Sequence, residues 1–304
     1  MKRALRVGVV LPTRETVIYG KLDPTPLLDM AEQAEHQGFD SVWVGDSIFV
    51  SGRFEPLVLL SAIAARTRTV TLGTAILVAP LRHPVLLAHA VTSLDRISGG
   101  RVVLGVGAGW LQQEFDAVGV PYAERTGRLA ETIRCCRALW SGEGSFHGKY
   151  WSFDGVNLQP LPQQEGGPPI LVGGAGPRAL RIAADFGDGW FPTSPDPAAF
   201  ASGLAEVNPA TAAVYLTINL DPERGPHEVR DYAQMYYGMP LDVMQQFQGY
   251  FVGPPDECLA WIRGYVDAGA DHVVLRFATP DAADQMSLAA EELLPELRGI
   301  EVEQ

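Results

Sequence analysis

The chain has 304 residues, of which 47% are hydrophobic, and its 23 basic and 36 acidic residues give a formal net charge of −13. This acidic balance argues against a nucleic-acid scaffold, because such proteins take their affinity from Lys and Arg contacts to phosphates. No apolar run approaches the roughly 20 residues of a membrane span, and the first residues are too few and too strand-like for a signal peptide. We therefore expect a cytoplasmic protein without nucleic-acid or membrane partners.

Three cysteines agree with that expectation. Cys135 and Cys136 are neighbours in a helical pattern, where they cannot easily pair with each other, and nothing nearby has the spacing of metal ligands. We interpret the cysteines as buried small hydrophobic residues in a reducing compartment.

Short runs rich in Val, Ile and Leu alternate with helical patterns along the chain. After the first run, a helix is expected to begin at Asp23 or Thr25, with a proline in its first turn, and to end at Gly38. Further helices are expected over Pro56–Arg66 and from Pro84 onward. The eight apolar runs are Leu5–Leu11, Ser41–Asp46, Val70–Leu77, Arg101–Gly107, Ile170–Gly173, Gly189–Pro192, Ala213–Leu220 and His272–Phe277.

This alternation predicts an α/β fold with a parallel sheet. Both faces of the runs are apolar, as expected when helices cover one side and a packed barrel interior the other. Eight β–α steps favour a (β/α)8 TIM barrel over a doubly wound sheet. The stretches 108–168 and 221–270 are too long for one helix and a turn, so we interpret them as insertions with lids or extra helices. We expect residues 1–304 to form a single domain.

In such a barrel the active site lies at the C-terminal ends of the strands. The segment Gly105–Trp110 superficially resembles a dinucleotide fingerprint, but its third glycine is missing and it follows the fourth strand rather than the first. We favour a strand end whose glycines let a flat ligand approach the backbone.

The segment Val172–Leu180 is more informative. A strand ends there in two glycines and a helix begins near Pro177, which leaves backbone N–H groups free to bind an anion. Arg178 adds a positive charge beside them. The alternative is a tight glycine turn without a ligand.

Hydrolytic and metal chemistry find no support in the sequence. Ser47 and Ser194 lie outside any GxSxG motif, and the six histidines are scattered. Neither an HExxH motif nor a pair of carboxylates indicates a metal site.

Several segments in succession carry a family resemblance: GFDSVWVGDS, TVTLGTAILVAPLRHP, LDRISGGRVVLGVGAGWLQQEF, RALWSGEGSFHGKYW, PPILVGGAGPRAL and FGDGWFPTS. Their order and spacing resemble the bacterial luciferase-like family, in particular the branch that binds the deazaflavin coenzyme F420. The similarity runs from about Leu5 to Thr193, with a weaker match at GPPDECLAWIRGYVDAGADHVVLRF. It implies a (β/α)8 barrel with insertions, usually a homodimer, that holds a flavin or deazaflavin across its strand ends.

The resemblance also implies cofactor-binding positions. Asp46 matches an aspartate that contacts the deazaflavin, and Ala75-Ile76 matches a bulge where relatives hold a non-prolyl cis peptide behind the ring. Thr193 matches a position on the phosphate or substrate side. The remaining positions are Val78 and Gln113, which match further cofactor contacts, and Gly174, Ala175, Gly176, Arg178 and Ala179 in the phosphate turn.

Two departures from the family pattern concern the substrate side. Members that oxidise sugar phosphates or alcohols carry His after the aspartate and Glu after the GxG turn, whereas this chain has Ser47 and Trp110. Ser47 is a poor general base and Trp110 cannot titrate. We therefore do not carry over the oxidation that those members catalyse, and we favour reduction of the substrate. Arg276, at the end of the eighth run, is our candidate for a substrate carboxylate or carbonyl; the alternative is a salt bridge across the barrel mouth.

Three functions remain open. The first is an F420-dependent oxidoreductase that transfers a hydride to a small organic substrate. The second is an FMN-dependent two-component monooxygenase supplied by a separate reductase, and the third is a non-catalytic flavin- or deazaflavin-binding barrel. A homodimer is expected through the helices after the second and third strands. Aromatic residues of the second insertion indicate either a roomy pocket or its own core: Tyr232, Tyr236, Tyr237, Phe247, Tyr250 and Phe251.

Overall fold

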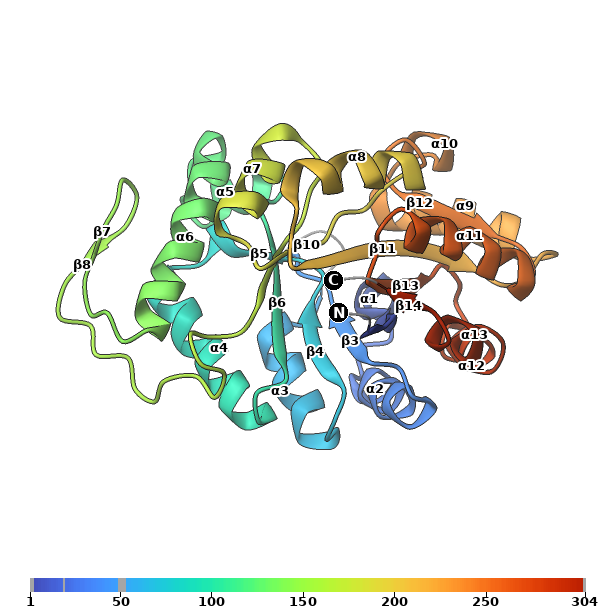
Figure 1. Cartoon of the computed structure of the whole chain (residues 1–304), viewed down its shortest axis with the longest axis horizontal. Helices are drawn as coiled ribbons and strands as arrows, with labels where there is room; N and C mark the ends of the chain where they lie inside the picture. The colour runs from blue at the N-terminus through green and yellow to red at the C-terminus, as the bar shows by residue number, and fades with distance from the viewer. Residues whose placement is uncertain (1–2, 19, 49–52, 303–304) are drawn as a thin grey trace.

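Parallel strands form a closed ring at the centre of the computed structural model, which describes residues 3–18, 20–48 and 53–302 (Figure 1). Each strand is hydrogen-bonded to the next, and the last pairs with the first, so the predicted (β/α)8 barrel is confirmed. In order around the ring the strands are β2 (Arg6–Val10), β3 (Ser41–Val44), β4 (Thr71–Thr74), β6 (Val102–Gly107), β9 (Ile170–Val172), β10 (Gly189–Trp190), β11 (Thr211–Asn219) and β13 (His272–Phe277).

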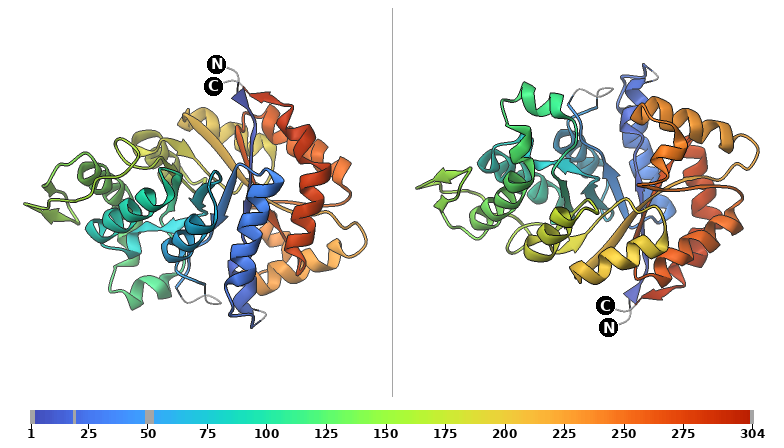
Figure 2. Two further views of the ribbon diagram at one scale, coloured as in Figure 1. Left: turned by 90° about the horizontal axis from the view of Figure 1, so that it is seen from below. Right: turned by 90° about the horizontal axis from the view of Figure 1, so that it is seen from above.

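Helices surround the barrel (Figures 1 and 2). The first helix of the outer layer covers Thr25–Gln37 and ends at Gly38, whose φ of 93° is left-handed, as its sequence predicts. None of the helices in the described ranges is long and apolar enough to cross a membrane. The outer helices are α2 (Thr25–Gln37), α3 (Pro56–Arg66), α4 (Pro84–Ser98), α6 (Arg125–Trp140), α7 (Pro177–Phe186), α8 (Pro197–Val207), α11 (Pro255–Asp267) and α12 (Ala282–Glu292).

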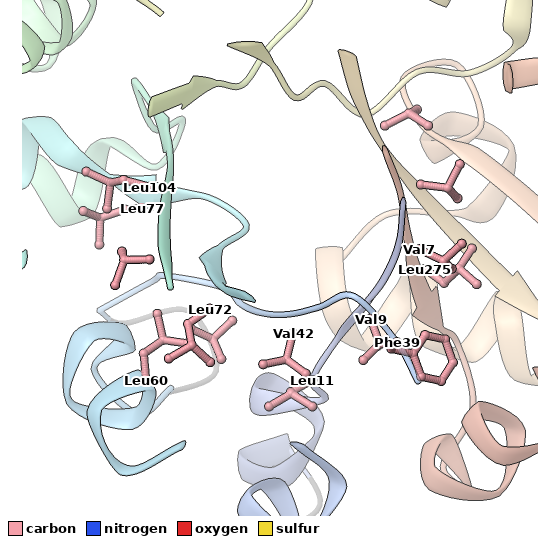
Figure 3. Close-up of a cluster of buried hydrophobic side chains, with 14 of the residues drawn as sticks. Val7, Val9, Leu11, Phe39, Val42, Leu60, Leu72, Leu77, Leu104 and Leu275 are labelled. Carbon is pink, nitrogen blue, oxygen red and sulfur yellow. The ribbon is translucent and has the colours of Figure 1, made fainter. Parts of the chain in front are cut away.

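The main core lies between the strands and this outer layer. Figure 3 shows part of it, in which Leu60 of α3 lies beside Leu72 of β4. Shorter elements complete the outside: α1 (Thr13–Ile18), α13 (Leu294–Arg298), and β1 (Arg3–Ala4) paired antiparallel with β14 (Glu301–Val302).

The third apolar run is interrupted rather than continuous. The sequence predicts one strand over Val70–Leu77, but the structure divides it into β4 and β5 (Leu77–Val78). Both pieces pair with β6: Gly73 lies opposite Val103, and Leu77 lies opposite Val106. Four steps on one strand thus match three on the other, which is the signature of a β-bulge. The Ala75–Ile76 peptide bond within this bulge is cis, as the family resemblance implies.

Each of the two long stretches contains several elements. The first holds α5 (Gln112–Ala117), the 3₁₀ turn η2 (Tyr122–Glu124), α6, and a hairpin of β7 (Phe146–His147) and β8 (Ser152–Phe153) that projects away from the barrel (Figure 2). The second holds α9 (Gly225–Tyr237), α10 (Leu241–Met244), β12 (Gly249–Val252) and α11. Strand β10 pairs with the first residues of β11, whereas β12 pairs with its last residues. This second stretch therefore lies over the barrel mouth.

The barrel interior is tightly packed around Trp43. The fully buried Trp43 ring occupies the space that a side chain on Gly73 would take, with an ideal Cβ there 2.1 Å from Trp43 Cε3. Trp43 Nε1 donates to Ser41 Oγ over 2.7 Å, and that hydroxyl lies 2.8 Å from His272 Nε2. Burial lowers the pKa of His272 well below its usual value, so the interior is uncharged at this point.

All three cysteines are free and buried. Burial raises the pKa of the Cys135 thiol to about 12, which keeps it protonated at neutral pH. Their surroundings agree with a packing role.

Candidate active site

A cavity of about 620 Å³ lies at the C-terminal ends of the strands. This volume falls within the range of small-molecule pockets. Its walls come from the segments that follow β2, β3, β4, β6, β9 and β10, and from the stretch that contains α9 and α10.

Asp46 follows β3 directly and lines the cavity, although its side chain is only 2% exposed. Its carboxylate accepts hydrogen bonds from both terminal nitrogens of Arg82, at 2.6 and 3.1 Å, and from the Val78 N–H at 2.9 Å. Burial alone would lower the pKa of Arg82, but its bonds to Asp46 and Glu55 outweigh burial and raise it. Asp46 therefore ties the loop after β3 to the bulge after β4.

The bulge supplies an apolar floor. Ala75, Ile76 and Val78 all line the cavity. An ideal Cβ on Gly107 would lie 1.8 Å from Ile76 Cδ1, and one on Gly173 would lie 3.1 Å from Ile76 Cγ2. The Ile76 side chain can lie flat over two neighbouring strand ends because both of those residues are glycines. Such a surface suits the face of a planar ring.

The predicted phosphate turn adjoins this floor. Gly174 lines the cavity, and the exposed residues Ala175, Gly176 and Arg178 continue from it into the start of α7, where Ala179 is half-buried. Gly176 is the N-cap residue of α7 and has no capping side chain. No atom lies within 4 Å of an ideal Cβ on Gly176, so the approach to this helix start is open. Thr193, after β10, also lines the cavity.

The cavity is lined by the residue after Gln113, which the family resemblance had indicated as a cofactor contact. Gln113 is exposed and is not part of the cavity lining, whereas Glu114 is 2% exposed and is part of it. Glu114 Oε1 accepts hydrogen bonds from Ser47 Oγ and from the Ile48 N–H, both at 2.6 Å. The short helix α5 turns Glu114 and Phe115 inward together, so the inner side chain is the carboxylate. In the sequence, the signal for an inward-facing carboxylate was the acidic Glu114 next to the aromatic Phe115.

Two of the three substrate-side candidates from the sequence, Ser47 and Trp110, reach the cavity. Ser47 does so while bound to Glu114. Trp110 is 55% exposed at the mouth, and its backbone oxygen accepts a hydrogen bond from Tyr122 Oη over 2.9 Å.

Arg276 does not take the position that the sequence suggested. It is 0% exposed, lies outside the cavity lining, and donates hydrogen bonds to Glu15 and, over 3.2 Å, to the Leu11 carbonyl. Its guanidinium is committed to this buried pair, so the structure supports the alternative role of a salt bridge, although it joins the end of β13 to the segment after the adjacent strand β2 rather than crossing the barrel mouth. Arg14 and Arg53 are the arginines that line the cavity.

The second insertion supplies both cavity wall and core. Tyr236, Tyr237 and Phe247 line the cavity, together with Met239 and Met244. The other aromatic residues that the sequence singled out, Tyr232, Tyr250 and Phe251, are absent from the lining and pack among hydrophobic neighbours.

Tyr215 lines the cavity from the barrel side. Burial raises its pKa to about 12, so its hydroxyl stays neutral at physiological pH. The cavity therefore joins a largely apolar body to a few polar groups.

Comparison with known proteins places this architecture in a family. The F420-dependent glucose-6-phosphate dehydrogenase of Kineococcus radiotolerans is 31% identical and aligns over 90% of this chain and 94% of its own length. An F420-dependent secondary alcohol dehydrogenase, solved with an F420–acetone adduct, shares the fold with a TM-score of 0.81 at 21% identity, over 97% of this chain and 100% of its own.

An FMN-containing structure has the same fold. The oxygenating constituent of 3,6-diketocamphane monooxygenase from Pseudomonas putida gives a TM-score of 0.74 at 19% identity, over 97% of this chain and 99% of its own. The family model described as luciferase-like monooxygenase matches residues 5–226. Since that match covers most of the barrel, the chain belongs to the luciferase-like monooxygenase family.

Proposed function

We propose that the protein is an F420-dependent oxidoreductase that transfers a hydride between the deazaflavin and a small organic substrate, with reduction of the substrate favoured. One observation carries the proposal: a flat apolar floor lines the cavity, and the open start of α7 follows directly from Gly174 in the cavity wall. The F420-dependent relative at 31% identity supports F420 over FMN.

The residues present fit a planar ring with an anionic tail. Ile76, backed by Gly107 and Gly173, matches the face of the ring. The uncapped start of α7 matches a phosphate, because N–H groups at a helix start attract negative charge. When bound, the deazaflavin supplies the hydride chemistry, while the protein orients the reactants and excludes water.

Two groups of side chains then have separate tasks. Asp46, Ala75, Ile76, Val78 and Thr193 hold the ring region, since all of them line the cavity. The turn Gly174, Ala175, Gly176, Arg178 and Ala179 holds the phosphate. We assign the cofactor contact that was predicted for Gln113 to Glu114, because Glu114 lines the cavity.

We assign proton transfer to Ser47 and Glu114. Ser47 by itself is a poor acid or base, but its hydroxyl donates to a buried carboxylate over 2.6 Å. A proton can therefore pass between the cavity and Glu114 through Ser47 Oγ. Because Ser47 and Trp110 stand where the family resemblance places His and Glu, we do not assign glucose 6-phosphate as the substrate.

Titration with each cofactor tests the proposal. We expect F420 to bind to the purified protein and FMN to bind more weakly, as followed by the fluorescence of each cofactor. Reduced F420 should then be oxidised by at least one member of a panel of enones and imines. Tighter binding of FMN would support the two-component monooxygenase, and F420 binding without any hydride exchange would support a non-catalytic barrel. If neither cofactor binds, the proposal is rejected.

We further propose a homodimer that forms through α3 and α4. A groove of about 460 Å³ lies between these helices and the segment before α4. Val58 on α3 is 70% exposed and Leu86 on α4 is 68% exposed, and both line the groove. Exposed apolar side chains that gather on one face favour a protein interface.

Light scattering after size exclusion tests the dimer. The double variant Val58→Glu/Leu86→Glu should elute as a monomer, because two buried carboxylates without partners would oppose association. Leu22→Glu is the matched control, since Leu22 is 67% exposed outside the groove, and it should remain dimeric. A monomeric unmodified protein would contradict the proposal.

A cytoplasmic location completes the proposal. The three free, buried cysteines suit a reducing compartment. A separate reductase that regenerates the reduced cofactor is the partner that repeated reduction of a substrate requires.

A further inference from the structure

Arg14 is an arginine of the cavity wall that has no ion-pair partner among the described residues. It follows β2, lines the cavity and is only 5% exposed. Its Nε is buried without a hydrogen-bond partner among the described residues, and its guanidinium carbon lies 4.3 Å from the centre of the Tyr236 ring. Burial lowers the pKa of Arg14, and the charge of Arg53 lowers it further. Both effects show that the positive charge of Arg14 is poorly compensated.

Arg53 lies on the same wall. Its guanidinium carbon is 5.2 Å from the centre of the same Tyr236 ring, and its Nη2 donates to the Tyr236 hydroxyl. Its Nη1 lies 3.4 Å from Thr13 Oγ1, and an ideal Cβ on Gly45 would lie only 1.8 Å from that nitrogen. The glycine at the end of β3 thus leaves the space that the guanidinium fills. In the described ranges, no carboxylate lies within ion-pair distance of Arg53. Burial opposes its charge, but Tyr236 and the Glu15 carboxylate outweigh burial and raise the pKa of Arg53, so the uncompensated charge on this wall is mainly that of Arg14.

The neighbouring carboxylates form their ion pairs and hydrogen bonds with other groups, although Glu15 Oε2 is buried without a hydrogen-bond partner among the described residues. Glu15 pairs with Arg276, and Asp46 pairs with Arg82. Glu114 accepts from the loop after β3. Two guanidiniums on one buried wall repel each other and lose hydration, which costs free energy unless an anion joins them. The arrangement is therefore that of an anion-binding subsite, in a protein whose net charge is −13.

This subsite lies across the barrel from the phosphate turn. Arg14 follows β2 and Gly174 follows β9, and these strands are four steps apart in both directions around the ring. A cofactor whose phosphate lies at the start of α7 has no need of Arg14 and Arg53. These arginines therefore face the part of the cavity that is left for the substrate.

The surrounding walls indicate the rest of the ligand. Planar guanidiniums match the two oxygens of a carboxylate, which they can bind with paired hydrogen bonds. A sugar would need many hydrogen-bond partners, whereas most of the nearby lining is aromatic or thioether. These residues are Tyr236, Tyr237, Met239, Met244 and Phe247.

We propose that the substrate is an aromatic or similarly apolar carboxylic acid whose carboxylate is bound by Arg14 and Arg53. The identification of this ligand as a substrate depends on the proposed function, whereas the binding of the carboxylate does not. The carboxylate would bind beside Tyr236, and the apolar body would extend from there toward the Ile76 floor.

Calorimetric titration with trans-cinnamate and its neutral analogue trans-cinnamamide tests this subsite. Cinnamate should bind to the unmodified protein at least about tenfold more tightly than the amide, because charge-assisted hydrogen bonds are about twice as strong as neutral ones. Arg14→Met and Arg53→Met should each remove most of that preference and leave the affinity for cinnamamide little changed. Arg230→Met, which removes the same charge from an exposed position on α9, should behave as the unmodified protein.

A second variant guards against a folding defect. If Arg14→Met fails to fold, Arg14→Lys takes its place, because lysine keeps the charge without the paired donors. Its preference for cinnamate over cinnamamide should be weaker than that of the unmodified protein and stronger than that of Arg53→Met. Glucose 6-phosphate is titrated in parallel. Tighter, Arg14-dependent binding of this sugar phosphate than of cinnamate would overturn the proposal, as would equal affinities for cinnamate and cinnamamide.

Titration of the same variants with F420 separates the two proposals. Unchanged F420 affinity in Arg14→Met and Arg53→Met is the expected result. If these variants lose F420 binding instead, the arginines hold the cofactor and the carboxylic-acid proposal is wrong. If the unmodified protein prefers cinnamate but does not bind F420, the carboxylate subsite stands and the proposed oxidoreductase function is the one rejected.

Discussion

Replacing Gly176 with Asp should weaken F420 binding about a hundredfold while leaving the barrel folded, since one lost charge-assisted hydrogen bond is worth about 1.5–3 kcal/mol and charge repulsion adds to it. Gly176 has an ordinary φ of −78°, and no atom lies within 4 Å of an ideal Cβ there. Any side chain therefore fits. An aspartate at this N-cap would accept the N–H groups of α7 and would place a negative charge where the cofactor phosphate is proposed.

Two further variants at the same position separate charge from capping. Gly176→Asn can also cap α7 but carries no charge, so its F420 affinity should lie between those of Gly176→Asp and the unmodified protein. Gly176→Ala neither caps nor repels and should bind almost normally. Since both capping residues should hold or raise the thermal midpoint, reduced affinity could not be attributed to unfolding. Normal F420 binding by Gly176→Asp would show that the phosphate lies elsewhere.

Glu114→Gln should lower kcat about a hundredfold, the lower end of the range for a group that transfers protons. The amide retains the shape of the carboxylate and one oxygen that can accept the Ile48 N–H, which Glu114 now accepts over 2.6 Å. It can neither deliver a proton to Ser47 Oγ, as reduction of the substrate requires, nor take one from it in the reverse direction. Steady-state rates with F420 and a substrate identified in the panel would measure the effect.

A positioning role for Glu114 would give a different pattern. If Glu114 exchanges protons, Glu114→Gln should remove one ionisation from the pH profile of kcat while the affinity for F420 stays within a few-fold. Ser47→Ala should reduce kcat similarly, and the double variant should be little slower than either single one, because both residues serve one path. An unchanged pH profile with a raised KM would show that Glu114 only holds the loop after β3.

Much of the barrel could be predicted from the sequence because its elements are determined by neighbouring residues. The helix over Pro56–Arg66 has the predicted bounds, with a proline at its first position. The preceding helix stops where Gly38 adopts a left-handed conformation that other residues avoid. Strands buried on both faces appear as continuous apolar runs, so their number and order were also visible.

The bulge in the third run shows where this local information ends. Val70–Leu77 is apolar throughout, and nothing in that pattern marks the extra residue that separates β4 from β5. The extra residue is defined only by the register of both pieces against β6. The family resemblance indicated the bulge, whereas hydrophobic periodicity could not.

The sequence by itself determined the α/β barrel, the glycine turn before α7 and the position of the site at the strand ends, because periodicity and helix breakers act over a few residues. Only the tertiary structure decided which side chains face the cavity. Glu114 rather than Gln113 turns inward because of how the short helix α5 packs, and Arg276 is withdrawn because Glu15 pairs with it. Such outcomes depend on residues far apart in the chain, whose contacts no local pattern records.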